Sequence, residues 1–312
     1  MVSICVPAYK KPAFVLRLLD AVLKQDYKDV EVVITDDSPN DDIKIAIAPY
    51  LSQLNVQFYR NIPALGSPMN WNAAIERSSG DFFMLLHQDD WFHSSSAISS
   101  FIEAFERNKA ASFVFCKNIA QQLDGTFVVL QAMPSLLQRL STYPNRLLLA
   151  QVMGPPSNVM LRSAVKTKVK YDEKLIWLVD VDYNARLIKA GYEYVYLDQH
   201  LVTIGLHKDQ TTEYCRENTD IMFRENIWVA QKIGPAAFRD ILIYDYYWRL
   251  LRNYGVRSMV DFCANKLSED EMPPVINFML KWQAVIPSAF LKLGPISKLL
   301  MALNYLVSPF KK

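Results

Sequence analysis

Short apolar segments alternate with helical patterns through the first 120 residues, and this alternation constrains the fold more than any other feature. The apolar segments are four to six residues long and rich in β-branched side chains: residues 2–6, 30–34, 56–59, 81–86 and 112–116. Helical spacing separates them over residues following Pro12, over 43–51, from an expected Ser67 cap to Arg77, and over 94–108. Such an order predicts an α/β fold with a mainly parallel sheet and helices on both faces.

The remaining chain has a different pattern. Strands are expected at residues 127–130, 158–161 and 194–197, and a helix at 180–190 that Gly191 closes. Beyond Thr211 the signals are mostly helical. We therefore predict one domain over residues 1–212, made of halves 1–120 and 121–212, and a helical C-terminal region over residues 213–312.

Composition excludes several classes of protein. The 312 residues carry 34 Lys and Arg against 32 Asp and Glu, a balance that argues against nucleic acid as a partner. Neither GxxxxGK[ST] nor GxGxxG occurs, which removes P-loop NTPases and the usual dinucleotide fingerprint. The start of the chain does not resemble a signal peptide and no apolar run reaches about 18 residues, so a cytoplasmic location is expected.

Residues 272–312 differ from the rest in charge. They contain five lysines and no Arg, Asp or Glu, with apolar and aromatic side chains between the lysines. A basic, amphipathic segment with a Trp is typical of a peripheral membrane helix. The alternative is a helical hairpin packed on the domain.

Polar clusters follow the predicted strands, where an open α/β sheet binds its ligands. His87-Gln88-Asp89-Asp90 follows one strand, and its adjacent carboxylates suit a hard divalent cation. Asp36-Asp37 follows another and can accept hydrogen bonds from a ribose or a base. An acidic turn and an Asx-turn are the respective structural alternatives.

Three further positions suggest chemistry. Asp180 and Asp182 stand at the start of a predicted helix, where a carboxylate either caps the helix or acts as a general base. Trp177 can stack on a sugar or belong to the core. His207 is either structural or a late ligand for a metal or a phosphate.

Together these segments resemble family 2 glycosyltransferases of the GT-A fold. The opening VSICVPAYKKPAFVLRLLDAVLKQDYKDVEVVITDDSPND is similar to that family's first strand, helix and nucleotide-binding strand. NIPALGSPMNWNAAIERSSGDFFMLLHQDD matches the stretch leading into its metal-binding DxD, with Gly66, Asn72, Gly80 and Asp89 at matching spacing. PSNVMLRSAV, WLVDVDYNARLIKAG and GLHKDQTT follow in the family's order, so the resemblance covers about residues 1–212.

The resemblance implies an inverting transferase that moves a sugar from a nucleoside-diphosphate sugar, by default a UDP-sugar, to a saccharide or lipid-linked saccharide. Asp89 and His207 would hold Mn²⁺ or Mg²⁺, and Asp180 would be the base. The residues expected to bind the donor are Pro7, Ala8, Tyr9, Asp36, Asp37, Arg60, Gly66, Asn72, Gln88 and Asp89. Those expected to bind the acceptor are Trp91, Trp177 and Ser157. A bacterial surface-polysaccharide or lipopolysaccharide pathway fits by analogy.

Two departures from the family pattern keep alternatives open. His87 replaces the first Asp of DxD, and Val179 replaces the acidic residue that usually precedes the base, so Asp182 competes with Asp180. A nucleotidyltransferase or another sugar-nucleotide enzyme is the second interpretation. A non-catalytic GT-A-like scaffold that binds a membrane partner is the third.

Overall fold

The computed structural model of this chain describes residues 1–122, 124–130 and 134–311. These residues form two compact units: unit 1 comprises residues 1–142 and 151–210, and unit 2 comprises residues 143–150 and 211–312. The functional halves expected within residues 1–212 stay a prediction.

A seven-stranded sheet runs through unit 1 in the order β10-β6-β9-β4-β1-β2-β3. Its strands are β1 (Val2–Ala8), β2 (Val30–Asp36), β3 (Asn55–Arg60), β4 (Phe82–Leu85), β6 (Ala111–Cys116), β9 (Val159–Arg162) and β10 (Glu193–Leu197). All neighbours pair in parallel except β9, which is antiparallel to both β4 and β6. The expected α/β fold with a mainly parallel sheet is confirmed.

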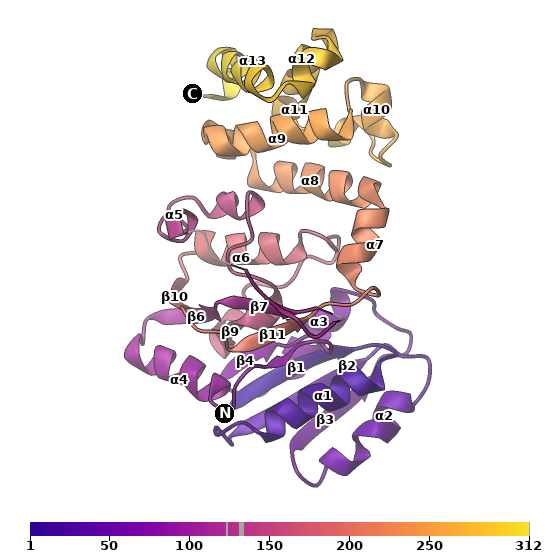
Figure 1. The fold of residues 1–312 in the computed structure, drawn as a ribbon, viewed down its shortest axis with the longest axis vertical. Coiled ribbons are helices and arrows are strands. Elements are labelled where there is room, and N and C mark those ends of the chain that lie inside the picture. Colours follow the sequence, from indigo (N-terminus) through magenta and orange to yellow (C-terminus); the bar gives the residue numbers. More distant parts are fainter. Residues whose placement is uncertain (123, 131–133, 312) are drawn as a thin grey trace. The chain divides into compact units, whose positions relative to one another are not determined.

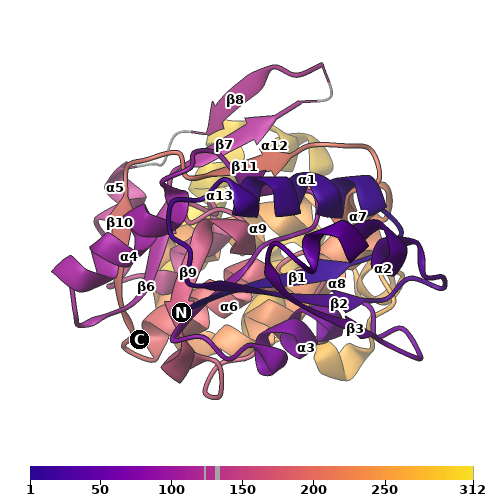
Figure 2. The same ribbon diagram turned by 90° about the horizontal axis from the view of Figure 1, so that it is seen from below.

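Helices cover both faces of this sheet (Figures 1 and 2). One face carries α1 (Pro12–Leu23), α2 (Asp42–Ile47) and α4 (Ala97–Arg107), and the other carries α3 (Met69–Arg77) and α6 (Val179–Lys189). Successive strand residues point to opposite faces, so alternate apolar positions such as Ile4, Val6 and Val32 join α1 in one core. A strand that is apolar at nearly every position is therefore buried on both sides.

A smaller sheet brings together segments that are distant in sequence. Its order is β5 (Trp91–Phe92), β11 (Val202–Gly205), β7 (Asn118–Gln121) and β8 (Phe127–Leu130). β11 is antiparallel to β5 and parallel to β7. Because β5 pairs with β11, the segment that follows β4 lies next to the segment that contains His207. A short helix, α5 (Pro134–Leu137), follows β8.

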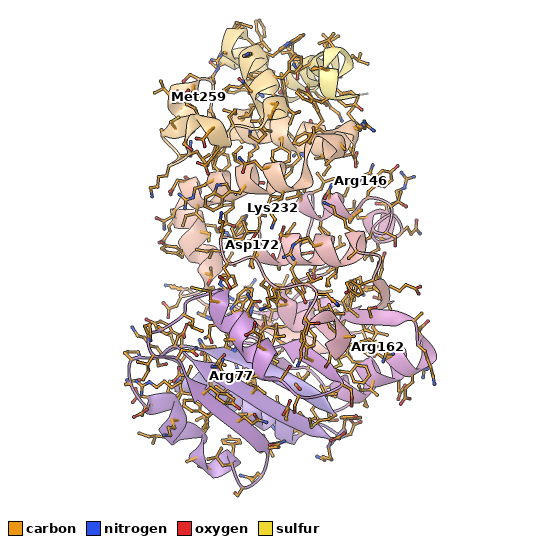
Figure 3. All side chains as sticks on the ribbon, turned by 180° about the vertical axis from the view of Figure 1, so that it is seen from behind. Arg77, Arg146, Arg162, Asp172, Lys232 and Met259 are labelled. Atoms are coloured by element: carbon orange, nitrogen blue, oxygen red, sulfur yellow. The ribbon has the colours of Figure 1, made fainter. Side chains whose placement is uncertain are left out.

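Unit 2 is helical. It contains α7 (Thr211–Glu217), α8 (Thr219–Ile233), α9 (Ile241–Tyr254), α10 (Met259–Cys263), α11 (Pro274–Val285), α12 (Ser288–Lys292) and α13 (Gly294–Val307). The aromatic side chains of Tyr244, Tyr247 and Trp248 on α9 are fully buried at its centre. Arg146, labelled in Figure 3, forms a largely buried ion pair with Asp240, with Nε 2.6 Å from Oδ2.

The boundaries of three predicted helices differ from the sequence expectation. The helix expected after a Ser67 cap begins at Met69 with Pro68 in the cap position, and the one expected from residue 94 begins at Ala97. The helix expected over 43–51 ends at Ile47 and continues as a 3-10 turn, because Pro49 has no amide hydrogen to extend an α-helix. Within the described residues, none of the helices has both the length and the apolar character needed to cross a membrane.

Candidate active site

Asp36 and Asp37 lie side by side at the carboxyl end of β2 but make different contacts. Oδ1 of Asp36 accepts hydrogen bonds from the amide and hydroxyl of Ser38, and its Oδ2 is buried without a partner among the described residues. Asp37 accepts bonds from Asn61 Nδ2 at 2.8 Å, Leu65 N at 3.0 Å and Gly66 N at 2.8 Å. The Asp37 carboxylate thus holds the loop after β3, while Asp36 keeps an acceptor for a ligand.

Arg60 ends β3 in register with Asp36 and points to the α2 side of the sheet. Its guanidinium pairs with Asp41, and both line a pocket of about 280 Å³ with Lys44 and Phe58. Nε of Arg60 is buried without a hydrogen-bond partner in the described part of the chain. Arg60 is therefore close to the Asp36 strand end but already partly neutralised.

The end of β1 is tied to the end of β4 by Gln88. The Tyr9 amide donates to Oε1 of Gln88 at 2.9 Å, and Nε2 of Gln88 donates to the Tyr9 carbonyl at 3.1 Å. Pro7 and Ala8 are buried in β1, and Tyr9 is exposed. Gln88 thus positions the backbone of the first strand end.

Gly66 and Asn72 flank the start of α3. Gly66 has a φ of +75°, which favours glycine, and directs its amide to Asp37. Asn72 is buried, with Nδ2 donating to the Tyr171 carbonyl at 2.9 Å and Oδ1 accepting from the Tyr171 amide at 3.0 Å. These contacts make Asn72 a tether between α3 and the segment before α6, and a donor-binding role for it stays a prediction.

His87, Asp89 and Asp90 form a compact cluster after β4. One ligand atom from each lies within 4.8 Å of the others. Oδ2 of Asp89 is 2.9 Å from Nε2 of His207, and Oδ2 of Asp90 is 3.9 Å from Nδ1 of His87. The side chains of Asp89 and His207 are each 17% exposed, so both are largely shielded from bulk water but remain partly accessible to solvent.

The pKa values of the two carboxyl groups in this cluster are shifted in opposite directions. Burial raises the pKa of Asp89, but the His207 hydrogen bond and the neighbouring His87 outweigh burial and lower that pKa overall. Burial and the charge of Asp89 raise the pKa of Asp90 well above its ordinary value. Burial also lowers the pKa of His87, which keeps its imidazole neutral at pH 7. Of the two groups, Asp89 therefore holds its negative charge more readily than Asp90.

This donor set fits a divalent cation. A carboxylate and a neutral imidazole are ligands for Mn²⁺, and carboxylate oxygens suit Mg²⁺. Nε2 of His87 is buried without a hydrogen-bond partner among residues described by the structure. A buried imidazole with one ring nitrogen unpartnered, in a cluster with two carboxyl groups, is a site that a cation would complete.

Backbone contacts fix the loop that carries the cluster. Arg17 donates to the Asp89 carbonyl from Nη2 at 2.5 Å and stacks on Trp91 with its guanidinium carbon 3.8 Å from the ring centre. The Gly205 amide donates to Oδ1 of Asp90 at 3.0 Å. The predicted acceptor residue Trp91 therefore has one face covered by Arg17.

Ser157 is also part of this support. It is fully buried, and its hydroxyl accepts a hydrogen bond from the His87 amide at 3.0 Å. This contact anchors the loop of residues 87–90, and an acceptor-binding role for Ser157 stays a prediction.

The first turn of α6 distinguishes its two aspartates. Asp182 is buried and forms an ion pair with Arg186, with Oδ2 2.7 Å from Nη2. Asp180 is partly exposed, and its Oδ1 accepts a bond from the Val181 amide at 2.8 Å. Burial raises the pKa of Asp180 to about 6. Trp177, two residues before α6, is half-buried.

Aromatic rings link the cluster to α6. The Trp71 ring lies 4.7 Å from the His87 ring and 5.3 Å from Tyr171, edge-on to the latter. Tyr171 in turn stacks on Tyr183 of α6 at 4.0 Å. This row connects the loop of residues 87–90 to the helix of Asp180 through packed aromatic rings.

The site thus unites most predicted residues around the strand ends and adds several that were not predicted. Arg17, Trp71 and Gln210 belong to the second group, with Nε2 of Gln210 donating to the Gly205 carbonyl at 2.8 Å. Trp71 directly precedes Asn72, and Gln210 follows His207 by three residues, so the sequence offered a signal for both of these.

Comparison with known proteins identifies relatives for this arrangement. Residues 3–167 match the profile described as Glycosyl transferase family 2. The chain is 25% identical to the amylovoran biosynthesis glycosyltransferase AmsB of Erwinia amylovora over 262 residues, which cover 80% of this chain and 83% of that protein.

Two solved structures share the fold. The S. aureus TarS 1-349 structure in complex with UDP-GlcNAc has a TM-score of 0.54 at 16% identity, covering 97% of this chain and 79% of TarS. The mannosyltransferase PcManGT from Pyrobaculum calidifontis, in complex with GDP-Man and Mn²⁺, has a TM-score of 0.53 at 13% identity. That alignment covers 99% of this chain and 81% of the mannosyltransferase.

Proposed function

The chain belongs to glycosyltransferase family 2 and is a glycosyltransferase of the GT-A fold, and from this premise we propose that it transfers a sugar, with inversion, from a nucleoside-diphosphate sugar to an acceptor hydroxyl. The cluster of His87, Asp89 and Asp90 at the end of β4 carries this proposal, because it offers a diphosphate a cation site. Because the chain belongs to this family, we set aside the two alternatives, a nucleotidyltransferase and a non-catalytic scaffold.

The donor would lie across the ends of β1, β2 and β4. Asp36 would accept a hydrogen bond from the base or the ribose on its free Oδ2, whereas Asp37 would keep the following loop in place. The backbone of Pro7–Tyr9 would contact the nucleotide, held by Gln88. UDP is our proposed nucleotide, supported by the fold shared with the TarS complex with UDP-GlcNAc.

Asp89 and His207 would hold Mn²⁺ or Mg²⁺, with His87 and Asp90 beside them. When bound, the cation would neutralise charge on the departing diphosphate. The complex of PcManGT with Mn²⁺ supports manganese as the first ion to test. Arg17 and Gly205 would keep the Asp89 carboxylate oriented, because both contact the same loop.

Asp180 would act as the general base. Its partial exposure and its pKa of about 6 suit a group that must be ionised near neutral pH and still accept a proton. Asp182 is buried and held in an ion pair with Arg186, which makes it less available to contact an acceptor hydroxyl. In the proposed step the acceptor oxygen bonds to the anomeric carbon, the bond from that carbon to the diphosphate breaks, and Asp180 takes the hydroxyl proton. One displacement inverts the configuration.

We further propose a saccharide or lipid-linked saccharide as the acceptor, on the cytoplasmic face of a membrane. The similarity to AmsB, named for amylovoran biosynthesis, supports a role in polysaccharide biosynthesis. The basic composition of residues 272–312 supports a lipid-linked acceptor. Half-buried Trp177 is our candidate for stacking on the acceptor sugar.

A thermal-shift panel of UDP, GDP, dTDP and CMP with their sugars, with and without Mn²⁺, tests the proposal. A ligand that binds only the folded state raises the melting temperature, so we expect manganese-dependent stabilisation by one nucleotide diphosphate. Stabilisation by none of them would contradict the donor site.

Two variants separate binding from chemistry. Asp89→Ala should abolish the manganese-dependent shift, whereas Asp180→Asn should keep the shift and lose transfer. Asp182→Asn is the matched control and should retain measurable transfer. Full turnover by Asp180→Asn would exclude Asp180 as the base.

A further inference from the structure

Helix α13 buries two polar side chains and leaves a row of apolar ones exposed. Its buried residues are Ser297, Met301 and Asn304, of which the two polar ones are almost completely enclosed. Its exposed positions include Ile296, Leu299 and Leu303. A surface helix normally buries its apolar stripe and exposes its polar one, so this arrangement has a cost in water that something must offset.

The buried polar side is built into the interior of unit 2. The hydroxyl of Tyr244 donates to Oδ1 of Asn304 at 2.6 Å, and Nε1 of Trp248 donates to the Ser297 hydroxyl at 3.2 Å. Nη1 of Arg252 reaches the same hydroxyl at 3.2 Å. These bonds to α9 fix the rotation of α13 about its axis, so its outward side is set by the fold.

Two further exposed apolar residues precede this stripe, Phe290 in α12 and Leu293 between the two helices. We call the six residues together the apolar face: Phe290, Leu293, Ile296, Leu299, Leu303 and Leu306, which are between 37% and 62% exposed. Its four members on α13 are spaced by three, four and three residues, which places them within an arc of about 80° at 100° per residue. Figure 1 shows α12 and α13 next to each other within unit 2.

The charged residues of the segment that carries this face have one sign. Lys292 and Lys298 are exposed on the same two helices, and residues 272–312 contain no acidic side chain. Lysines at the border of an apolar surface can extend their ammonium groups to anionic headgroups while their methylene stems stay on the apolar side. A second copy of this chain would place lysines opposite lysines, which opposes a symmetric dimer through this face.

We infer that the apolar face of α12 and α13 docks on the surface of a bilayer that contains anionic lipids. The helices would lie in the interface, with the leucine side chains in the acyl boundary and Lys292 and Lys298 at the headgroups. A role for this contact in bringing the enzyme to a lipid-linked acceptor rests on the proposed function, but the docking itself does not.

Vesicle co-sedimentation with the full chain tests this inference. We expect binding to vesicles of equal parts phosphatidylglycerol and phosphatidylcholine, little binding to phosphatidylcholine alone, and release in molar salt. Leu299→Glu with Leu303→Glu should abolish binding. Lys292→Glu with Lys298→Glu should weaken it by at least about twentyfold, since each basic residue near an anionic surface contributes roughly fivefold.

Matched controls remove trivial explanations. Val260→Glu changes an exposed apolar residue of α10 outside the face, and Lys24→Glu with Lys168→Glu repeats the charge change in unit 1. Both control variants should bind vesicles as the unmodified chain does. Binding measured over a series of salt concentrations corrects this comparison for their altered net charge. All substituted positions are exposed, so melting temperatures should not change by more than a few degrees.

Three outcomes would overturn the inference: no binding to the anionic vesicles, unchanged binding by Leu299→Glu with Leu303→Glu, or a dimer in sedimentation velocity that this double variant dissociates. Nucleotide-dependent thermal shifts measured on the same samples report the donor site. A chain that binds nucleotide but not vesicles would contradict only the docking, and one that binds vesicles but no nucleotide would contradict only the transferase site.

Discussion

Asp180 predicts a specific pH dependence of transfer. Burial raises the pKa of this carboxyl group from 3.8 to about 6. A general base must be ionised, so the active fraction follows the titration of Asp180. With a pKa of about 6, about nine-tenths of the molecules are active at pH 7 and about one-tenth at pH 5.

The expected result is an approximately tenfold fall in kcat/KM between pH 7 and pH 5. With the ordinary pKa of 3.8, the same change of pH would lower the rate by less than about a tenth. The two cases differ enough for an initial-rate assay with a radiolabelled or chromogenic acceptor to separate them. The raised pKa therefore makes acid inactivation a quantitative test of the assignment.

Loss of the cation at low pH could produce a similar fall, so donor binding must be measured over the same range. If protonation of Asp180 alone causes the loss of activity, calorimetric titration with nucleotide and saturating Mn²⁺ should give a nearly constant affinity from pH 5 to pH 7. The Asp182→Asn variant should keep the inflection near pH 6. A flat profile from pH 5 to pH 7, or an inflection that follows the nucleotide affinity, would refute the reasoning.

Three other substitutions test the supports of the site and of unit 2. Gly205→Ala would place a Cβ 2.3 Å from the Asp89 carbonyl oxygen, so the loop of residues 87–90 must move. We expect the free energy of unfolding, measured with denaturant, to fall by about 1–3 kcal/mol. We also expect calorimetry to show at least a tenfold weaker manganese-dependent affinity for nucleotide. Trp71→Leu removes the ring between His87 and Tyr171, and transfer should fall more than stability if the aromatic row positions the loop. Arg146→Leu leaves Asp240 buried without its partner and should cost about 3–5 kcal/mol in thermal or denaturant unfolding of unit 2, with unit 1 retaining nucleotide binding.

The fold followed from the sequence, and a site at the strand ends could be predicted from it, because both depend on local patterns. Apolar segments of strand length between helical segments define a parallel sheet, and its carboxyl ends collect whatever polar residues follow the strands. Asp36 and Asp89 were predicted in this way, whereas Asp180 was predicted from its place at the start of a helix and from the family resemblance. The helix starts were less accurate, because Pro68 occupies the cap position that a serine usually takes.

The contacts of individual site residues could not be predicted because they join segments far apart in the chain. Asp37 bonds with Leu65 and Gly66, and Asn72 bonds with Tyr171, so groups that look like ligand contacts are used by the protein itself. Arg17 illustrates the converse, because nothing in its helix indicates that it reaches the Asp89 carbonyl. Tertiary packing decides which polar groups remain for a ligand.

The same burial that makes Asp180 a suitable base must reduce the stability of the fold. A carboxyl group whose folded pKa is higher than its unfolded pKa binds protons more tightly in the folded state, so the free energy of unfolding falls as pH rises from about 4 to about 6. Above pH 6 the full cost applies, at most about 3 kcal/mol for a shift of this size, and less because Asp180 is partly exposed. Asp180→Asn should therefore melt at a higher temperature than the unmodified chain at pH 7 and at nearly the same temperature at pH 4. A difference that does not change with pH would mean that Asp180 titrates normally and that its role as the base needs another explanation.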